Sequence, residues 1–245
     1  MRRFNRRSSG PSADTGRLQA RPTQPTARTA APIGLQTLGL ADDRDGLIYV
    51  PSSYRPERPA PLALMLHGAG GKAQQGLALL QPVAEEAGLI LLAPDSRQRT
   101  WDIIMRQYGP DIAFIDQALA QTFSRYTVDP ARVAIGGFSD GASYALSVGI
   151  TNGDLFNAII AFSPGFLAPA TQIGQPRVFI SHGTQDTVLP IQACSQRIVP
   201  QLEQAGYNVR YHEFEGPHTV PAEMVSAALS WFNTQSDGAE SGNLR

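Results

Sequence analysis

The stretch Arg132–Gly149, RVAIGGFSDGASYALSVG, decides how this chain folds. Its apolar start, Val133–Ile135, predicts a strand, two glycines break the run, and Ala142–Val148 has helical character. The middle, Gly137–Gly141, has the pattern G-x-S-x-G of a nucleophile elbow, a strained turn that projects a serine hydroxyl above a parallel sheet. The stretch therefore predicts a strand, a sharp turn and a helix.

Ser139 is the candidate nucleophile of this turn. The alternative is that it only caps an ordinary helix. Glycines at 137 and 141 favour the first interpretation, because a Cβ at either position would crowd the strand and the helix where they approach each other. A pattern with three fixed positions also occurs by chance, so the rest of the chain has to supply the partners that a nucleophile needs.

Strand and helix patterns alternate on both sides of this stretch. Apolar runs bounded by turn residues predict strands, and apolar positions three and four residues apart predict helices. Pro200 falls inside a predicted helix, which we expect to bend or restart there. The predicted strands are Leu47–Val50, Pro61–Leu66, Leu89–Ala93, Phe156–Phe162, Arg177–Ser181 and Val209–Phe214, and the predicted helices are Gln74–Ala87, Asp111–Tyr126, Ile191–Ala205 and Val220–Trp231.

This alternation predicts the α/β class, with a doubly wound, mostly parallel sheet and helices on both faces. We expect a single domain over 34–234. Residues 1–33 are predicted to form a disordered basic tail, and 235–245 a flexible C-terminal tail. Within the first tail, Gly16–Pro22 has the alternative of lying along the sheet as an extended edge.

Composition and charge exclude several classes of protein. Of the 245 residues, 42% are hydrophobic and 17% charged, which is typical of a soluble globular protein. The first 28 residues hold seven arginines and one aspartate, a charge of +6. Because the net charge of the chain is −1, the remaining residues carry −7, and this acidic body argues against nucleic acid as the main partner. No apolar run is long enough to span a membrane. Polar residues follow MRRFNRR where a signal peptide needs an apolar core, so we expect a cytoplasmic protein.

A nucleophilic serine needs a base and an orienting carboxylate. Of the four histidines, His218 lies in a Gly-Pro loop between the last predicted strand and helix, which favours it as the base over a loop histidine without a role. Asp186 lies in the loop after the predicted strand Arg177–Ser181 and is the candidate acid. The alternative is that Asp186 only caps the helix that follows. Asp140 is a rival acid, but beside the serine at a helix N-terminus it is expected to interact with helix N–H groups.

The oxyanion of an acyl-transfer intermediate needs preorganised N–H donors. One is predicted to be the backbone N–H of Asp140, the residue after the nucleophile. The other is predicted in the glycine-rich loop His67–Gly71, which follows a buried strand, and there we favour the N–H of Ala69. The alternative for this loop is a plain tight turn.

Four segments, LHGAGG, GGFSDGAS, SHGTQD and FEGPH, occur in this order and resemble the carboxylesterase/phospholipase branch of the α/β-hydrolases. Within that branch, the chain is most similar to esterases that resemble poly(3-hydroxybutyrate) depolymerases. The resemblance covers about Leu47–Trp231 and implies an α/β-hydrolase fold with the chain order Ser139, Asp186, His218. One departure is Asp140, where many relatives carry Gln, although its donor is a backbone group.

Four residues are candidates for contact with the substrate: Trp101, Phe138, Gly70 and Leu189. Trp101 is interpreted as a wall of the site, with a buried loop anchor as the alternative. About a dozen residues separate the strands ending at Phe162 and beginning at Arg177, too few for a helical cap, so we expect an open site. No H-E-x-x-H or paired-cysteine pattern is present, so no metal and no cofactor are expected.

These patterns together predict a serine carboxylic-ester hydrolase that forms an acyl-enzyme on short to medium acyl esters. A lysophospholipase or a hydrolase of hydroxyalkanoate oligomers is the alternative within this class, and an acyltransferase or peptidase would use the same residues. A non-catalytic binding module on the same scaffold is the alternative of another class. The expected partner is a small-molecule ester, and the sequence indicates no oligomeric state.

Overall fold

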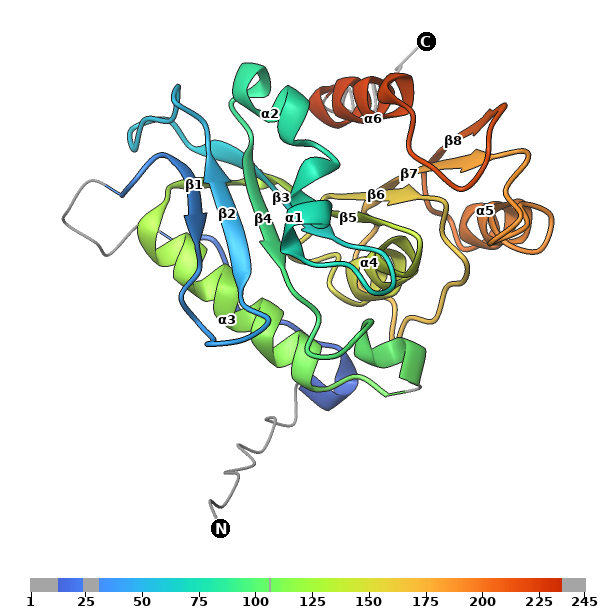
Figure 1. Ribbon diagram of the computed structural model, residues 1–245, viewed down its shortest axis with the longest axis horizontal. Helices are drawn as coiled ribbons and strands as arrows, with labels where there is room; N and C mark the ends of the chain where they lie inside the picture. The colour runs from blue at the N-terminus through green and yellow to red at the C-terminus, as the bar shows by residue number, and fades with distance from the viewer. Residues whose placement is uncertain (1–12, 24–30, 106, 235–245) are drawn as a thin grey trace, which may run out of the picture.

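The computed structural model describes residues 13–23, 31–105 and 107–234. Within these ranges, eight strands form one sheet in the order β1-β2-β4-β3-β5-β6-β7-β8 (Figure 1). The sheet is parallel from β4 to β8, and β1 and β2 extend it antiparallel. The strands are β1 (Gly34–Thr37), β2 (Gly46–Val50), β3 (Ala60–Leu66), β4 (Ile90–Pro94), β5 (Val128–Phe138), β6 (Ala158–Phe162), β7 (Arg177–Gly183) and β8 (Val209–Phe214).

Helices cover both faces of this sheet, so the predicted fold class is confirmed (Figure 1). Every residue of β3, β4 and β6 is buried, as expected of strands packed between two helical layers. No helix in the described ranges is long and apolar enough to cross a membrane. One face carries α3 (Pro110–Arg125), α4 (Asp140–Thr151) and α5 (Ser195–Gln204), and the other carries α1 (Ala73–Ala78), α2 (Gln81–Ala87) and α6 (Ala222–Asn233).

Proline has different effects on two of the predicted helices. The expected helix 74–87 is divided into α1 and α2, because Pro82 has no N–H and its ring would collide with the preceding turn of a continuous helix. Pro82 lies in the first turn of α2, where a proline is tolerated. Pro200, in contrast, lies inside α5 without dividing it. Its position is exposed, so water can bond the carbonyl that loses its partner.

The prediction of disorder is wrong for residues 13–23, which we call the N-terminal strap. Leu18 is fully buried, and its N–H donates to Asn152 Oδ1 at 2.8 Å. Arg17 forms a bidentate pair with Asp154, with both N···O distances 2.9 Å, and Arg21 contacts the same carboxylate. The hydrogen bonds from Arg17 lower the pKa of Asp154 to about 2. The strap therefore has specific partners at the end of α4.

The strap packs on helices and not along the sheet edge, since its Gln19 and Ala20 N–H groups donate to Asp116 in α3. The alternative that Gly16–Pro22 lies along the sheet as an extended edge is therefore wrong. Residues 1–12, 24–30 and 235–245, which belong to the two predicted tails, lie outside the described residues.

Replacing Leu18 by Ala is expected to lower the free energy of unfolding by about 2–5 kcal/mol, because a fully buried leucine leaves a cavity between the strap and the helices. Urea denaturation measures the change. The matched control is Leu35→Ala, at a position that is 50% exposed, where a small change is expected. Equal losses in the two variants would show that the strap does not contribute to the core.

Candidate active site

Ser139 lies between β5 and α4 in a strained backbone conformation, with φ 58° and ψ −121°. A Cβ on Gly137 would meet backbone atoms of Gly141 and Leu66 at 2.6 Å, and one on Gly141 would meet Leu66 O at 2.3 Å. Only glycine fits at either position, because real Cβ atoms do not approach backbone that closely. The turn is therefore an elbow fixed by close packing of backbone on backbone.

The structure brings Ser139, His218 and Asp186 into one chain of hydrogen bonds. His218 Nε2 lies 2.9 Å from Ser139 Oγ, and His218 Nδ1 lies 2.5 Å from Asp186 Oδ2. A carboxylate only accepts, so Nδ1 carries the proton and Nε2 is free to accept from the serine hydroxyl. The three residues follow β5, β7 and β8, whose carboxyl ends lie at the same edge of the sheet.

Asp186 is buried and held on both of its oxygens. Its Oδ1 accepts the N–H groups of Val188 at 2.9 Å and Leu189 at 2.8 Å, while Oδ2 accepts from His218. Burial alone would raise the pKa of Asp186, but the hydrogen bonds from Leu189 and His218 outweigh it and hold the pKa below its ordinary value. The carboxylate therefore stays ionised beside the imidazole.

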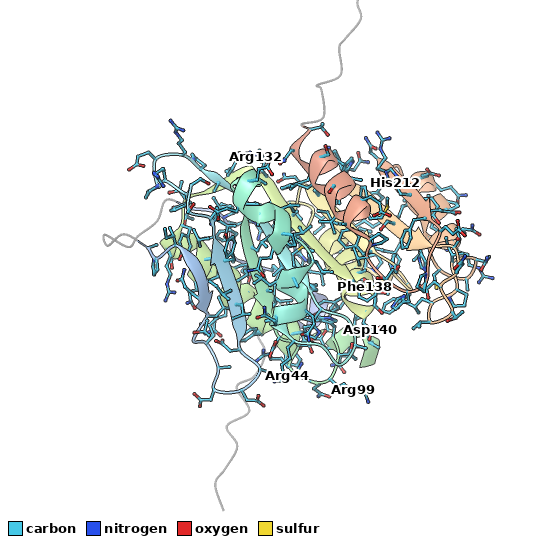
Figure 2. All side chains as sticks on the ribbon, turned by 45° about the horizontal axis from the view of Figure 1, so that its top comes forward. Arg44, Arg99, Arg132, Phe138, Asp140 and His212 are labelled. Atoms are coloured by element: carbon cyan, nitrogen blue, oxygen red, sulfur yellow. The ribbon has the colours of Figure 1, made fainter. Side chains whose placement is uncertain are left out.

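Asp140, the rival acid, takes no part in this chain. Its Oδ2 accepts the hydroxyl of Thr100 at 2.6 Å, in place of the helix N–H groups that were expected. Figure 2 shows Phe138 and Asp140 close together at the end of β5 opposite Arg132. The side chain of Asp140 is thus directed to the loop after β4.

The glycine-rich loop His67–Gly71 packs directly on the elbow. A Cβ on Gly68 would lie 3.4 Å from the Cβ of Ser139. The N–H groups of Gly70 and Gly71 donate to Arg99 O and Gly68 O, whereas the Ala69 N–H has no acceptor among the described residues. The Asp140 N–H is in the first turn of α4, where N–H groups lack intrahelical partners. Two donors are thus available at the elbow.

Gly70 has a positive φ of 72° and lies on the exposed side of the loop. Its N–H is already bonded to Arg99 O at 2.8 Å. Gly70 is therefore exposed to a ligand only through its carbonyl and Cα, and its contact with substrate stays a prediction.

Trp101 is fully buried, so its interpretation as a wall of the site is wrong. Its indole N–H donates to His67 O at 2.9 Å, and its ring stacks on Tyr144 at 5.2 Å between centroids. An indole with both a carbonyl partner and a stacking partner is drawn beneath the loop and away from solvent. Trp101 is therefore a buried anchor of the loop, which was the alternative interpretation of this residue.

His67 is a second anchor of this loop, and its position before a glycine was its only sequence signal. Ser96 N–H donates to its Nε2 at 3.0 Å, so Nδ1 carries the proton and donates to Gly68 O at 2.7 Å. Burial lowers the pKa of His67, which is consistent with the neutral ring that these bonds require. The ring fixes the start of the glycine-rich loop.

A pair of carboxylates, half-buried Asp102 and buried Asp111, ties the loop after β4 to the first turn of α3. Each accepts the other's backbone N–H, at 2.7 and 2.9 Å, and Asp102 Oδ1 accepts the hydroxyl of Tyr144 at 2.8 Å. Burial, with the neighbouring charge of Asp102, raises the pKa of Asp111 to about 7. A cavity of about 530 Å³ lies beside this pair and reaches Thr100, the partner of Asp140.

Phe138 and Leu189 both lie beside the hydrogen-bonded chain. The half-buried ring of Phe138 is 4.6 Å from the ring of His218. Leu189 is the last residue of the 186–189 turn that holds Asp186, and its side chain faces Gly165. Their contact with substrate stays a prediction. Among the described side chains, no group of three or more His, Cys, Asp or Glu residues is arranged to hold a metal ion.

Trp101→Phe is expected to lower the free energy of unfolding by about 1–3 kcal/mol, because the buried carbonyl of His67 loses its donor. KM values for esters of different size should change little. The matched control is Trp231→Phe on α6, where the ring is half-buried. A large change in KM for bulky esters at unchanged stability would restore the wall interpretation.

Residues 89–236 match the family model described as phospholipase/carboxylesterase. A bifunctional acetylxylan esterase/xylanase of Neocallimastix patriciarum is 32% identical over 158 residues, which are 61% of this chain and 22% of that protein. Feruloyl esterase C of Emericella nidulans is 26% identical over 156 residues, 60% of this chain and 57% of that protein. The chain thus spans about a fifth and about half of the length of these relatives.

Solved structures of esterases have the same fold. Esterase PE8 superposes with a TM-score of 0.61 at 26% identity and covers 75% of this chain and 97% of its own. A ferulic acid esterase of Anaeromyces mucronatus superposes with a TM-score of 0.63 at 18% identity and covers 89% and 98%. At 18% identity, the likeness to this ferulic acid esterase shows a shared fold alone.

Proposed function

The chain belongs to the phospholipase/carboxylesterase family of α/β-hydrolases, and from this membership we propose that it hydrolyses carboxylic esters through an acyl-enzyme on Ser139. The observation that carries the proposal is the chain of hydrogen bonds from Ser139 through His218 to Asp186. Its distances and tautomer match what a serine nucleophile needs from its base and from the carboxylate that orients the base.

In the first step, His218 Nε2 takes the proton of the Ser139 hydroxyl as Oγ attacks the ester carbonyl. The imidazolium that forms keeps its Nδ1–H bonded to Asp186. Because the pKa of Asp186 is held low, this proton stays on the imidazole and the carboxylate stabilises the cation by its charge.

The negative charge that develops on the carbonyl oxygen is placed between the N–H groups of Ala69 and Asp140. Removing one such donor costs about 2.7–4 kcal/mol in known enzymes, because the donors are already oriented before the charge appears. In this chain His67 and Trp101 hold the loop that presents Ala69. The buried anchors thus serve the oxyanion site without touching the substrate.

The intermediate collapses when His218 returns its proton to the leaving alcohol, which leaves the acyl group on Ser139. Water then takes the place of the alcohol. His218 accepts a proton from this water as it attacks the acyl carbonyl, and returns the proton to Ser139 Oγ as the acid leaves. The enzyme ends in its starting protonation state.

We infer short to medium acyl esters as substrates from the surroundings of Ser139. The segment 163–176 between β6 and β7 forms neither helix nor strand, so this segment supplies no helical cap over the serine. Phe166, Leu167 and Leu189 are half-buried and supply a limited apolar surface for an acyl group. The names of the relatives add acetyl and feruloyl esters to the candidates.

Ser139→Ala is expected to abolish hydrolysis of p-nitrophenyl acetate and labelling by an organophosphonate. Asp186→Asn should lower kcat by about 10⁴-fold, because the amide holds the wrong tautomer of His218. Asp140→Asn, which keeps the backbone donor, is the matched control and should cost little. The reverse ranking would reassign the acid, and a wild-type chain that never reacts with the phosphonate would be a binding module.

A panel of acetyl, butyryl, feruloyl, hydroxybutyrate-oligomer and lysophospholipid esters, ranked by kcat/KM, tests the substrate class. We expect kcat/KM to rise from acetyl to medium chains and then to level off. Each buried CH₂ contributes about 0.8 kcal/mol, but carbons that extend beyond an uncapped rim stay in water. A maximum on the lysophospholipid would contradict the proposed acyl range, and product analysis with alcohol or amine acceptors detects acyl transfer.

A further inference from the structure

His182 is a completely buried histidine at the end of β7, behind the proposed catalytic acid. Its Nδ1 lies 2.6 Å from the hydroxyl of Ser195, the first residue of α5. Its Nε2 lies 2.8 Å from Leu189 O and 3.2 Å from Asp186 Oδ2. The ring therefore joins β7, α5 and the turn that holds Asp186.

These partners determine where the ring carries its proton. The carbonyl of Leu189 can only accept, so Nε2 is the protonated nitrogen. Burial lowers the pKa of His182, so the ring is neutral and Nδ1 accepts the hydroxyl proton of Ser195. The single Nε2–H is then directed at both Leu189 O and the carboxylate of Asp186.

We propose that His182 is a positioning residue for Asp186, fixing the carboxylate that orients His218. The inference rests on the proposed function of Ser139, Asp186 and His218. Its Nε2–H holds the 186–189 turn by the carbonyl of Leu189, and the N–H of the same residue holds Asp186 Oδ1. The same proton also faces Oδ2, the oxygen that accepts from His218.

A neutral donor at Oδ2 also limits how strongly the carboxylate attracts the imidazolium of His218, because the negative charge is shared among more hydrogen bonds. The titratable groups that face this cluster are Asp186 and His218 from the two loops and Cys194 beside Ser195. Burial raises the pKa of the Cys194 thiol, so this group stays neutral there. In the proposed reaction His218 is the group near His182 that changes charge state, while Asp186 stays ionised.

Three variants separate positioning from mere filling of the core. His182→Gln places an amide N–H where Nε2 lies, so the bonds to Leu189 and Asp186 persist. His182→Asn is too short to reach them but keeps a polar group near Ser195. Ser195→Ala leaves the ring in place and removes only the hydroxyl that donates to Nδ1. The matched control is His212→Asn on β8 (Figure 2). The ring of His212 stacks on Phe179 and forms none of the hydrogen bonds described for His182.

With the whole chain and p-nitrophenyl acetate, His182→Asn should lower kcat by about 10- to 100-fold at little change in KM, the loss typical of a hydrogen-bonding partner behind a functional group. The acidic limb of its kcat/KM profile should move to higher pH, because a carboxylate with fewer donors holds the imidazolium more tightly. Ser195→Ala should move the limb in the same direction by less. His182→Gln should restore most of kcat.

A second measurement does not depend on turnover. The Nδ1–H of His218, bonded to Asp186 at 2.5 Å, should give a far-downfield proton NMR signal that shifts or broadens in His182→Asn and persists in His182→Gln and His212→Asn. Equal kcat, pH profile and signal in the Asn and Gln variants would overturn the positioning role. If the signal changes in His182→Asn as expected but the wild-type chain has no esterase activity, the proposed function is overturned and the positioning role stands.

Discussion

The approach of three backbone segments at the elbow is the constraint on which the rest of the structure depends. Gly137, Gly141 and the carbonyl of Leu66 are so close that no Cβ fits between them. This contact holds β3, β5 and α4 together, and it keeps Ser139 in a conformation that a non-glycine residue adopts only under strain. Because the turn cannot relax, the Cα–Cβ bond of Ser139 keeps one direction at the end of β5.

Two buried polar shells extend from this point, one on each side. On one side, His67 and Trp101 fix the glycine-rich loop by hydrogen bonds to its own backbone. On the other side, His182 and Ser195 lie behind Asp186. Both histidines have lowered pKa values because they are buried, and both therefore act as neutral, directional donors and acceptors. Such satisfied networks orient groups without introducing an unpaired buried charge.

Where the predictions from sequence were wrong, long-range packing outweighed local preference. The composition of residues 13–23 is that of a disordered tail, yet Leu18 reaches the core and Arg17 pairs with Asp154. Trp101 follows a strand at the edge of the site, as a rim residue would, but its stacking with Tyr144 draws it inside. Neither partner lies near in the sequence, so no local pattern indicates the contact.

The sequence by itself determined the strand–turn–helix around Ser139 and the α/β class, because periodicity and the sterics of glycine act locally. The chain order of a serine, an aspartate and a histidine followed from the resemblance to the α/β-hydrolases. Only the tertiary structure decided which histidine meets which carboxylate. Ser139 and His218 are 79 positions apart, and sequence spacing does not encode the distance between their side chains. Only the structure also showed that His182 is buried behind Asp186. In the sequence, a buried histidine of this kind and an ordinary turn histidine both appear as a histidine before a glycine.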